Sequence, residues 1–322
     1  MKVLVSHRLP GAALDRLAGY CELDIWPQDH PIPPADLHKR LSDCQGLLCL
    51  LTNRIDQALL DACPRLRFVS SMSVGVDHVD VEALTRRGIP LGNTPGVLVD
   101  TTAELTLALM LAAARRIPEA DRYVRAGQWS PERPWQPDMM MGKDLAGATL
   151  GLVGLGAIGQ AVAQLAGAFG MEVIAWNRSP RHVAGVHQVS FQELLARSDV
   201  LSVHVALTED TRNLLDSSAI AAMKPGAIVV NTARGGIIDE WALAAALEEG
   251  RLFSAGIDVF ETEPVAMDNP LLALENVVVA PHIGSATERT RGRMAALAVD
   301  NAIAATTGQP MPHCVNPSVY RN

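Results

Sequence analysis

The segment TLGLVGLGAIG, residues 149–159, decides the fold class of this chain. It reads as an apolar strand followed by Gly154, Gly156 and Gly159 in G-x-G-x-x-G spacing, and a helix-like run, QAVAQLAGAFG, comes next. In that setting the first glycine permits a tight turn, the second lets the backbone approach a pyrophosphate, and the third allows close helix packing. The helix N-terminus adds free N–H groups and a positive dipole. Any glycine-rich turn can match the spacing alone, but the strand before it and the helix after it favour a dinucleotide site.

Short apolar runs that end in polar or glycine-rich turns follow this motif, with helical patterns between most of them. The runs are MEVIAWNRSP, SDVLSVHVALT, GAIVVNTARG, FSAGIDVF and NVVVAPHIG. The first hundred residues alternate in the same way, through KVLVS, ALDRLAGY, GLLCLLT and RLRFVSSM. This alternation predicts βαβ units around parallel sheets, and a chain of 322 residues exceeds what one compact core usually organises. We therefore expect a two-domain α/β protein with ligand sites at the carboxyl ends of its strands.

Composition narrows the class of protein. With 48% hydrophobic and 19% charged residues the chain has the composition of a globular enzyme, and its net charge of −8 argues against a nucleic-acid or anionic-membrane binder. No run approaches the ~18 apolar residues of a membrane span, because Arg115 and Arg116 interrupt the apolar run after Glu104. The N-terminus MKVLVSHRLP reads as a strand rather than a secretion signal. We expect a small-molecule partner, and neither a nucleic acid nor a membrane.

The cysteines indicate a reducing compartment. They show no C-x-x-C spacing, and most lie in apolar segments. This predicts buried free thiols in a cytoplasmic protein and no metal site. The five are Cys21, Cys44, Cys49, Cys63 and Cys314.

The turn after the strand MEVIAW bears on the choice of cofactor. An acidic residue there would bind both ribose hydroxyls of NAD, but this chain has Asn177, Arg178 and Ser179. Losing the carboxylate removes repulsion against a 2′-phosphate, which Arg178 and Ser179 can instead bind. We therefore expect NADP(H) to be preferred, with NAD(H) open as an alternative. A solvated turn is the competing interpretation, because Arg181 and His182 lie close by in equally polar sequence.

Three later strand ends carry residues able to do acid–base and anion chemistry. Arg234 follows AIVVNTA, Glu263 follows AGIDVF, and His282 follows NVVVAP. Singly, Arg234 could pair with Asp239, Glu263 could be a solvated charge, and His282 could cap a helix. Together they indicate a catalytic set. A glutamate beside a histidine favours the imidazolium, which can give a proton to a carbonyl oxygen during hydride transfer, and an arginine can bind a carboxylate.

The chain resembles the D-isomer-specific 2-hydroxyacid dehydrogenases over essentially its whole length. The resemblance rests on SMSVGVDHVD, TTAELTLALML, GLVGLGAIG, NTARGGIIDE, AGIDVFETEP and PHIGSAT. Within the family it is most similar to the glyoxylate/hydroxypyruvate reductases, on the strength of LLT, MSVGVDH and VDTTAEL. The resemblance implies reduction of a small 2-keto acid, glyoxylate or hydroxypyruvate, with Arg234, Glu263 and His282 as the catalytic residues.

Further site residues are implied by the same resemblance. The substrate would bind Arg234, the backbone N–H groups of the loop Ser73, Val74 and Gly75, and a site near Leu51. The cofactor contacts would come from Thr102, the turn with Gly154, Leu155, Gly156, Ala157, Ile158 and Gly159, then Asn177, Arg178, Ser179, Ala206, Thr211, Thr232, Ala233, Asp258 at the nicotinamide amide, and Gly284. Two positions depart from the family pattern. Ala206 stands where proline is frequent, which loosens the assignment of that loop, and Asn177 replaces the acidic ribose ligand, which agrees with NADP.

The resemblance also implies an architecture. Two Rossmann-like domains with doubly wound parallel sheets are expected: a discontinuous, flavodoxin-like substrate domain of residues 1–99 and 286–322, and an NAD(P)-binding domain of residues 100–285. A homodimer is expected as well. The Pro- and Trp-rich segment around Trp129 and Trp135 is a candidate dimer arm.

Rival functions stay open at this stage. D-3-phosphoglycerate dehydrogenase would need extra cations near the substrate loop, where Arg54 is the obvious candidate, and no regulatory domain follows Tyr320. Phosphite or formate oxidation usually starts from NAD, which the NADP-type turn disfavours. A nucleotide-sensing scaffold of the corepressor type would carry binding appendages that this chain lacks. The preferred 2-keto acid cannot be ranked, because pocket width depends on the loops at Leu51, Val74 and Met139 to Met141.

Overall fold

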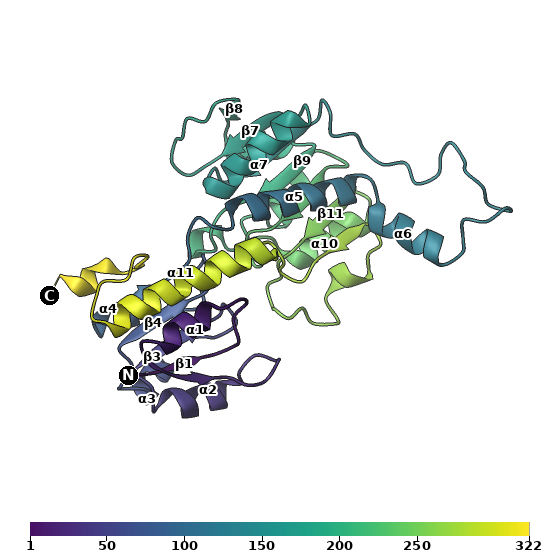
Figure 1. The fold of residues 1–322 in the computed structure, drawn as a ribbon. Helices are drawn as coiled ribbons and strands as arrows, with labels where there is room; N and C mark the ends of the chain where they lie inside the picture. Colours follow the sequence, from purple (N-terminus) through teal and green to yellow (C-terminus); the bar gives the residue numbers. More distant parts are fainter. Residues whose placement is uncertain (322) are drawn as a thin grey trace. The chain divides into compact units, whose positions relative to one another are not determined.

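The structure is a computed structural model that describes residues 1–321, and these form two compact units (Figure 1). The first unit comprises Met1–Leu98 and residues 285–321, and the second comprises Val99–Gly284. Each unit has its own sheet of parallel strands, so the expected α/β class with two Rossmann-like sheets is confirmed. No helix within residues 1–321 is long and apolar enough to cross a membrane.

The first unit contains a five-stranded sheet in the order β2-β1-β3-β4-β5. This is the flavodoxin-like order 2-1-3-4-5, in which ligands bind at the carboxyl ends of the strands near β1 and β3. The strands are β1 (Lys2–Val5), β2 (Glu22–Ile25), β3 (Gly46–Cys49), β4 (Phe68–Ser71) and β5 (Leu91–Gly92).

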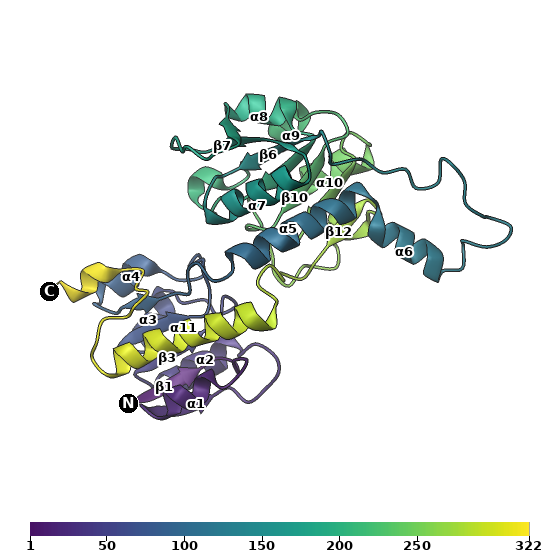
Figure 2. The ribbon, with the colours of Figure 1, turned by 45° about the horizontal axis from the view of Figure 1, so that its top comes forward.

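Helices cover both faces of this sheet (Figure 2). Successive side chains of a strand point to opposite faces. Accordingly Val3 and Val5 pack against α1 and α11, whereas Leu4 packs against the opposite helix layer. The helices are α1 (Ala13–Ala18), α2 (Pro34–Leu41), α3 (Gln57–Ala62), α4 (Val81–Arg86), α11 (Glu288–Thr306) and the 3-10 helix η3 (Pro317–Tyr320).

The second unit contains a seven-stranded sheet in the order β12-β11-β10-β9-β6-β7-β8. The chain runs outward from β6 in both directions, so the strand order reverses between β6 and β9, where dinucleotides bind in sheets of this kind. The strands are β6 (Thr149–Val153), β7 (Glu172–Trp176), β8 (Val186–Gln188), β9 (Val200–Val203), β10 (Ile228–Asn231), β11 (Ser254–Ile257) and β12 (Val277–Val279).

Alternation along β6 divides the core of the second unit into two layers. Leu150 and Leu152 pack against α5 and α7, whereas Val153 packs with the layer on the other face. Several helices begin at a side-chain cap, as Ser190, Asp216 and Asp239 accept N–H groups of the following turn. The helices are α5 (Val99–Ala114), α6 (Ile117–Arg125), α7 (Ala157–Ala168), α8 (Phe191–Arg197), η1 (Glu209–Thr211), α9 (Ser217–Ala222), α10 (Glu240–Glu248) and η2 (Pro270–Ala273).

Helix α6 and the loop that follows it, residues 126–144, project from the second unit, and the loop returns to that unit at Lys143, whose N–H donates to the Ala114 carbonyl at 2.8 Å (Figure 1). No side chain of α6 is buried. Large apolar side chains of this arm are exposed, with Trp135 at 73% and Ile117 at 55% of their accessible surface. The arm, defined as residues 117–144, therefore presents apolar surface to its surroundings.

Candidate functional site

The glycine turn after β6 has the geometry that a dinucleotide phosphate needs. Gly154 has φ +101°, and a Cβ there would lie 2.7 Å from the carbonyl oxygen of His204. A Cβ on Gly159 would lie 2.4 Å from the carbonyl oxygen of Gly154, so α7 packs closely against the turn. Beside Gly156, by contrast, a Cβ would meet open space. That open approach at the N-terminus of the 12-residue helix α7 fits a bound pyrophosphate.

The turn after β7 is tied to the glycine turn through Asn177. Its Oδ1 accepts a hydrogen bond from the Leu155 N–H at 3.1 Å, and its Nδ2 donates to the Ser179 carbonyl at 2.6 Å. Arg178 pairs with Asp210, with 3.4 Å between Nη1 and Oδ2, and both side chains are about four-fifths exposed. An ion pair so exposed is weak. Arg178 therefore has a counter-ion that a phosphate can displace.

The loop after β9 is closed by a threonine. The Thr211 hydroxyl donates to the Ala206 carbonyl at 2.6 Å and accepts the Thr208 N–H at 2.8 Å. The second of these bonds, together with the Thr208 side chain that accepts the Thr211 N–H, forms a capping box at the start of η1. Thr211 therefore orders the loop.

The turn after β10 presents Arg234. The buried Asn231 donates from Nδ2 to the Arg234 carbonyl at 2.8 Å and accepts the Ala233 N–H at 3.0 Å. The Arg234 guanidinium donates to the Ala233 carbonyl at 2.8 Å. In the same turn, the buried Thr232 forms a hydrogen bond with Thr106, and the two hydroxyl oxygens are 2.8 Å apart. The amide of Asn231 therefore holds the backbone of the arginine turn in one conformation.

Gly235 lets this turn approach the turn after β11. A Cβ on Gly235 would lie 1.9 Å from the carbonyl carbon of Phe260 and 2.3 Å from the Glu261 nitrogen. Real Cβ atoms do not come so close to backbone, so only glycine fits here. The close approach brings the segment with Arg234 next to the segment with Glu263.

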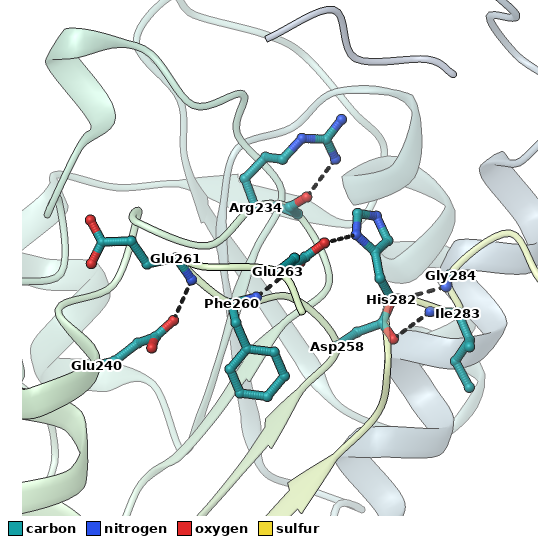
Figure 3. Close-up of polar contacts among 10 residues, drawn as sticks. Arg234, Glu240, Asp258, Phe260, Glu261, Glu263, His282, Ile283 and Gly284 are labelled. Carbon is teal, nitrogen blue, oxygen red and sulfur yellow. Dashed lines mark hydrogen bonds and ion pairs between the residues drawn. The ribbon is translucent and has the colours of Figure 1, made fainter. Parts of the chain in front are cut away.

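Glu263 and His282 form a hydrogen-bonded pair (Figure 3). His282 Nδ1 lies 2.6 Å from Glu263 Oε2, and the Phe260 N–H donates to Glu263 Oε1 at 3.0 Å. Burial by itself raises the pKa of Glu263. The hydrogen bond and charge of His282, the Phe260 N–H and the charge of Arg234 outweigh burial and leave that pKa below its ordinary value. The carboxylate is therefore ionised at neutral pH and faces the ring.

Asp258 positions the histidine turn (Figure 3). Its two carboxylate oxygens accept the N–H groups of Ile283 at 2.7 Å and Gly284 at 2.9 Å, and its carbonyl accepts the His282 N–H. His282 has φ +54°, a left-handed conformation that few non-glycine residues adopt. Burial is the main cause that raises the pKa of Asp258. Thr102 completes the turn, since its hydroxyl donates to the Gly284 carbonyl at 3.0 Å.

The loops expected to bind substrate lie in the first unit. Leu51 is 38% exposed in a turn held by the buried Asn53, whose Oδ1 accepts the Leu50 N–H at 3.0 Å. In the second loop the carbonyls of Ser73, Val74 and Gly75 all accept hydrogen bonds. Within residues 1–321 the N–H groups of Val74 and Gly75 donate to no protein acceptor. The loop therefore offers two backbone donors to an anion.

Sequence reasoning missed the residues that hold these turns. Asn53, Asn93 and Asn231 each donate to or accept from the backbone of a functional loop. The signal available in the sequence is a polar side chain at the end of an apolar strand, as with Asn231 at the end of β10 and Asn93 directly after β5. Across the described chain, no group of three His, Cys, Asp or Glu side chains is placed to hold a metal ion.

Comparison with known proteins extends these observations. Residues 107–284 match the family model of the NAD-binding domain of D-isomer-specific 2-hydroxyacid dehydrogenases. A glyoxylate reductase from Korarchaeum cryptofilum is 45% identical over 324 residues, which cover 99% of this chain and 97% of that protein. A solved structure of a protein from Thermus thermophilus has a TM-score of 0.93 and 47% identity, covering 98% of this chain and 100% of that one.

A second solved structure carries ligands. It is an NADPH-dependent glyoxylate/hydroxypyruvate reductase from Sinorhizobium meliloti in complex with NADP and malonate, with a TM-score of 0.86 and 31% identity, covering 98% of this chain and 97% of that one. Together with the glycine turn, these likenesses place the protein in the class of NAD(P)-dependent oxidoreductases. More particularly, the chain belongs to the D-isomer-specific 2-hydroxyacid dehydrogenase family, as its sequence motifs predicted.

Proposed function

We propose that this protein is an NADPH-preferring reductase of small 2-keto acids, which converts glyoxylate to glycolate, hydroxypyruvate to D-glycerate, or both. The observation that carries the proposal is the hydrogen-bonded pair of His282 and Glu263, 2.6 Å apart. The turn that leads to Glu263 lies directly against the turn of Arg234, with the closest approach at Gly235. The names of the relatives from K. cryptofilum and S. meliloti support the substrate class. When bound, a reduced nicotinamide would supply the hydride.

In the proposed mechanism His282 is the proton donor. Its Nδ1 faces Glu263, so the proton that leaves for the keto oxygen is the one on Nε2. The carboxylate stabilises the imidazolium before the transfer and orients the ring throughout. Glu263 stays ionised while it stabilises the imidazolium and orients the ring.

Arg234 is proposed to bind the substrate carboxylate and to polarise the keto oxygen as negative charge develops there. A guanidinium offers two parallel donors to a carboxylate, and Asn231 restricts the conformation of the backbone that carries it. The loop of Ser73, Val74 and Gly75 is proposed to add backbone donors, with Leu51 as an apolar contact. Residues 1–99 and 286–322 would accordingly form the substrate domain.

Residues 100–285 are proposed to bind the cofactor. The turn of Asn177, Arg178 and Ser179 supports NADP(H) over NAD(H), because it carries no carboxylate of its own and the exposed ion pair of Arg178 with Asp210 is weak enough for a phosphate to displace. The proposed contacts with the cofactor are Thr102, Gly154, Leu155, Gly156, Ala157, Ile158, Gly159, Asn177, Arg178, Ser179, Ala206, Thr211, Thr232, Ala233, Asp258 and Gly284.

The proposed function is tested by steady-state kinetics of the purified protein. NADPH and NADH are compared at fixed glyoxylate, and then glyoxylate, hydroxypyruvate, pyruvate and 3-phosphohydroxypyruvate are compared at fixed NADPH. We expect the highest kcat/KM with NADPH and one of the first two acids. A preference for the phosphorylated acid would favour the phosphoglycerate dehydrogenase alternative. Tight NADPH binding without turnover of any acid would favour a nucleotide-sensing scaffold.

We also propose a homodimer in which the arm contacts a second copy. The exposed Trp129 and Trp135 and the exposed apolar side chains of α6 support this, because exposed apolar and aromatic side chains gathered on one segment are typical of protein–protein interfaces. Sedimentation of the protein and of a Trp129→Ser, Trp135→Ser double variant tests the proposal. We expect a dimer for the first and a shift toward monomer for the second.

A cytoplasmic location is proposed as well. All five cysteines are free, and burial raises the pKa of Cys44 to about 11 and that of Cys49 to about 12, which keeps both thiols protonated. Free thiols of this kind suit a reducing compartment. Fractionation of cells that express the tagged protein from its own gene tests the location.

A further inference from the structure

Two serines and a histidine form a chain of hydrogen bonds beneath the substrate loop proposed above. Ser71 Oγ lies 2.7 Å from Ser73 Oγ and 3.0 Å from His78 Nε2. The Ser73 hydroxyl donates to the Gly75 carbonyl at 2.8 Å. Both serines are buried, with at most 3% of their surface exposed, so water does not compete for their hydroxyls. His78 is therefore linked to the loop through two serine hydroxyls that cannot exchange their hydrogen bonds for bonds to water.

The direction of each hydrogen bond follows from counting protons. A carbonyl oxygen cannot donate, so the single hydroxyl proton of Ser73 goes to Gly75. Ser73 Oγ must then accept from Ser71, which uses the single proton of that hydroxyl. Ser71 Oγ in turn must accept from His78, so Nε2 of the ring carries a proton. The relay thus runs from His78 through Ser71 and Ser73 to the Gly75 carbonyl.

This relay holds one of the three carbonyls that shape the loop. The Ser73 carbonyl accepts the Thr94 N–H at 2.8 Å, and the Val74 carbonyl accepts from Asn93 Nδ2 at 2.9 Å. The Gly75 carbonyl has the Ser73 hydroxyl as its partner. With all three carbonyls engaged, the intervening N–H groups of Val74 and Gly75 are left to face an anion.

We propose that His78 is a positioning residue for binding of the substrate carboxylate. By donating to Ser71 Oγ, His78 keeps the Ser71 hydroxyl turned toward Ser73 and so helps to hold the Gly75 peptide in the orientation in which its neighbouring N–H groups bind the carboxylate of a 2-keto acid. The proposal rests on the proposed function, because it assigns His78 a part in binding that substrate. Binding through the loop is made equally in the ground state and the transition state, so its loss raises KM and leaves kcat nearly unchanged.

The test compares two substitutions of His78. His78→Gln keeps an N–H donor at about the distance of Nε2, whereas His78→Leu removes it. We expect His78→Leu to raise KM for the 2-keto acid roughly two- to tenfold, the range for one lost hydrogen bond, and His78→Gln to restore most of it. The dissociation constant of NADPH, titrated by fluorescence, should stay unchanged in both variants. Ser70→Ala is the matched control, since Ser70 adjoins Ser71 on β4 but its hydroxyl donates to the Ala298 carbonyl instead.

A double-mutant cycle with Ser71→Ala makes the test sharper. If His78 acts through Ser71, the effects of His78→Leu and Ser71→Ala on KM overlap, and the double variant is no worse than the more affected single variant. Ser71→Ala alone provides the measurement if His78→Leu does not fold. An unchanged KM in His78→Leu, no rescue by Gln, or additive effects in the cycle overturns the proposal while the wild-type protein still reduces the 2-keto acid. Absence of turnover in the wild-type protein instead overturns the proposed function, and this proposal with it.

Discussion

His282 Nδ1 and Glu263 Oε2 lie 2.6 Å apart, although the two residues are 19 positions apart in the chain. Each partner is held by backbone hydrogen bonds, Glu263 by the Phe260 N–H and His282 by the Asp258 carbonyl. The pair is therefore assembled in the protein itself, and substrate binding does not have to create it. Removing either partner should leave the other in place, which makes their separate contributions measurable.

Glu263→Gln should move the basic limb of the pH profile for reduction to lower pH. The amide keeps the shape of the side chain but removes the negative charge that favours the imidazolium. His282→Ala is the companion variant and should lose most turnover at every pH. The measurement is kcat/KM across a pH series from acid to alkaline, and an unshifted basic limb in the Gln variant would contradict the role assigned to Glu263.

The same substitution predicts a pH-dependent change in stability. The pKa of Glu263 is lower in the folded protein than its ordinary value of 4.5. A lowered pKa contributes stability that is fully present above the ordinary value and is lost as the pH falls through the folded value. The Gln variant should therefore be less stable than the wild type at neutral pH, and the difference should shrink below about pH 4.5. Urea unfolding at a series of pH values measures it.

Arg178→Ala should raise KM for NADPH and change KM for NADH little, because only NADPH has a 2′-phosphate to lose. A charge-assisted contact worth about 1.5–3 kcal/mol corresponds to roughly ten- to hundredfold. Arg197→Ala is a matched control, since Arg197 is also exposed and forms surface ion pairs with Glu172 and Glu193. Equal losses with both cofactors would show that Arg178 does not bind the phosphate.

Asp210→Asn should act in the opposite direction. Asp210 pairs with Arg178 at 3.4 Å and, as a carboxylate, repels a phosphate at the same place. An exposed pair of this kind contributes about 0.2–1 kcal/mol, so KM for NADPH should fall by at most roughly fivefold. KM for NADH serves as the internal control. A higher KM for NADPH would mean that Asp210 orients Arg178 rather than competing for it.

Arg234→Lys should lower kcat as well as raise KM for glyoxylate. Lysine keeps the charge but loses the planar two-point donor, so the keto group is held less accurately for hydride transfer. Binding of NADPH, titrated by fluorescence, should be nearly intact. Wild-type turnover of Arg234→Ala at saturating glyoxylate, or loss of NADPH binding in its place, would refute the assignment.

Gly235→Ala should reduce both stability and kcat. The added Cβ would lie 1.9 Å from a backbone carbon of Phe260, so the turns that carry Arg234 and Glu263 must separate. Overpacking against backbone typically costs about 1–3 kcal/mol. Gly292→Ala, where a Cβ within α11 meets open space, is the control and should be neutral or slightly stabilising. A Gly235→Ala variant with wild-type melting temperature and kcat would show that the close approach is not required.

The central strands and the edge strand β12, which lies in the run NVVVAP, were predictable from sequence, whereas the edge strands β2 and β8 were not. β3 and β10 are buried along their whole length and appear as continuous apolar runs. β2 (Glu22–Ile25) and β8 (Val186–Gln188) lie at sheet edges, have no fully buried residue and carry mixed polar and apolar side chains. These two strands form because they pair with a neighbouring strand. Their own sequences contain no continuous apolar run that would predict a strand.

Candidates for the chemistry of the site could be named from the sequence, but the residues that support them could not. The positions of Arg234, Glu263 and His282 after apolar strands mark them as candidates. That Asn231 holds one turn and Asp258 another depends on which atoms meet after the strands have paired, and spacing along the chain does not specify it. The same holds for Gly235. Glycine is required there because the backbone of Phe260, which is distant in the sequence, lies against it.

The interruption of the first unit by the second has a consequence for biosynthesis. One face of the first sheet, with Val3 and Phe68, is covered partly by α11, and Ser70 donates to the Ala298 carbonyl of that helix. A ribosome translates residues 99–284 before it reaches α11. The nascent chain therefore holds every core residue of the second unit while the first sheet still lacks its cover, and exposed apolar surface of this kind is what chaperones bind. The first unit therefore begins to be synthesised first but is completed last, after the whole of the second unit.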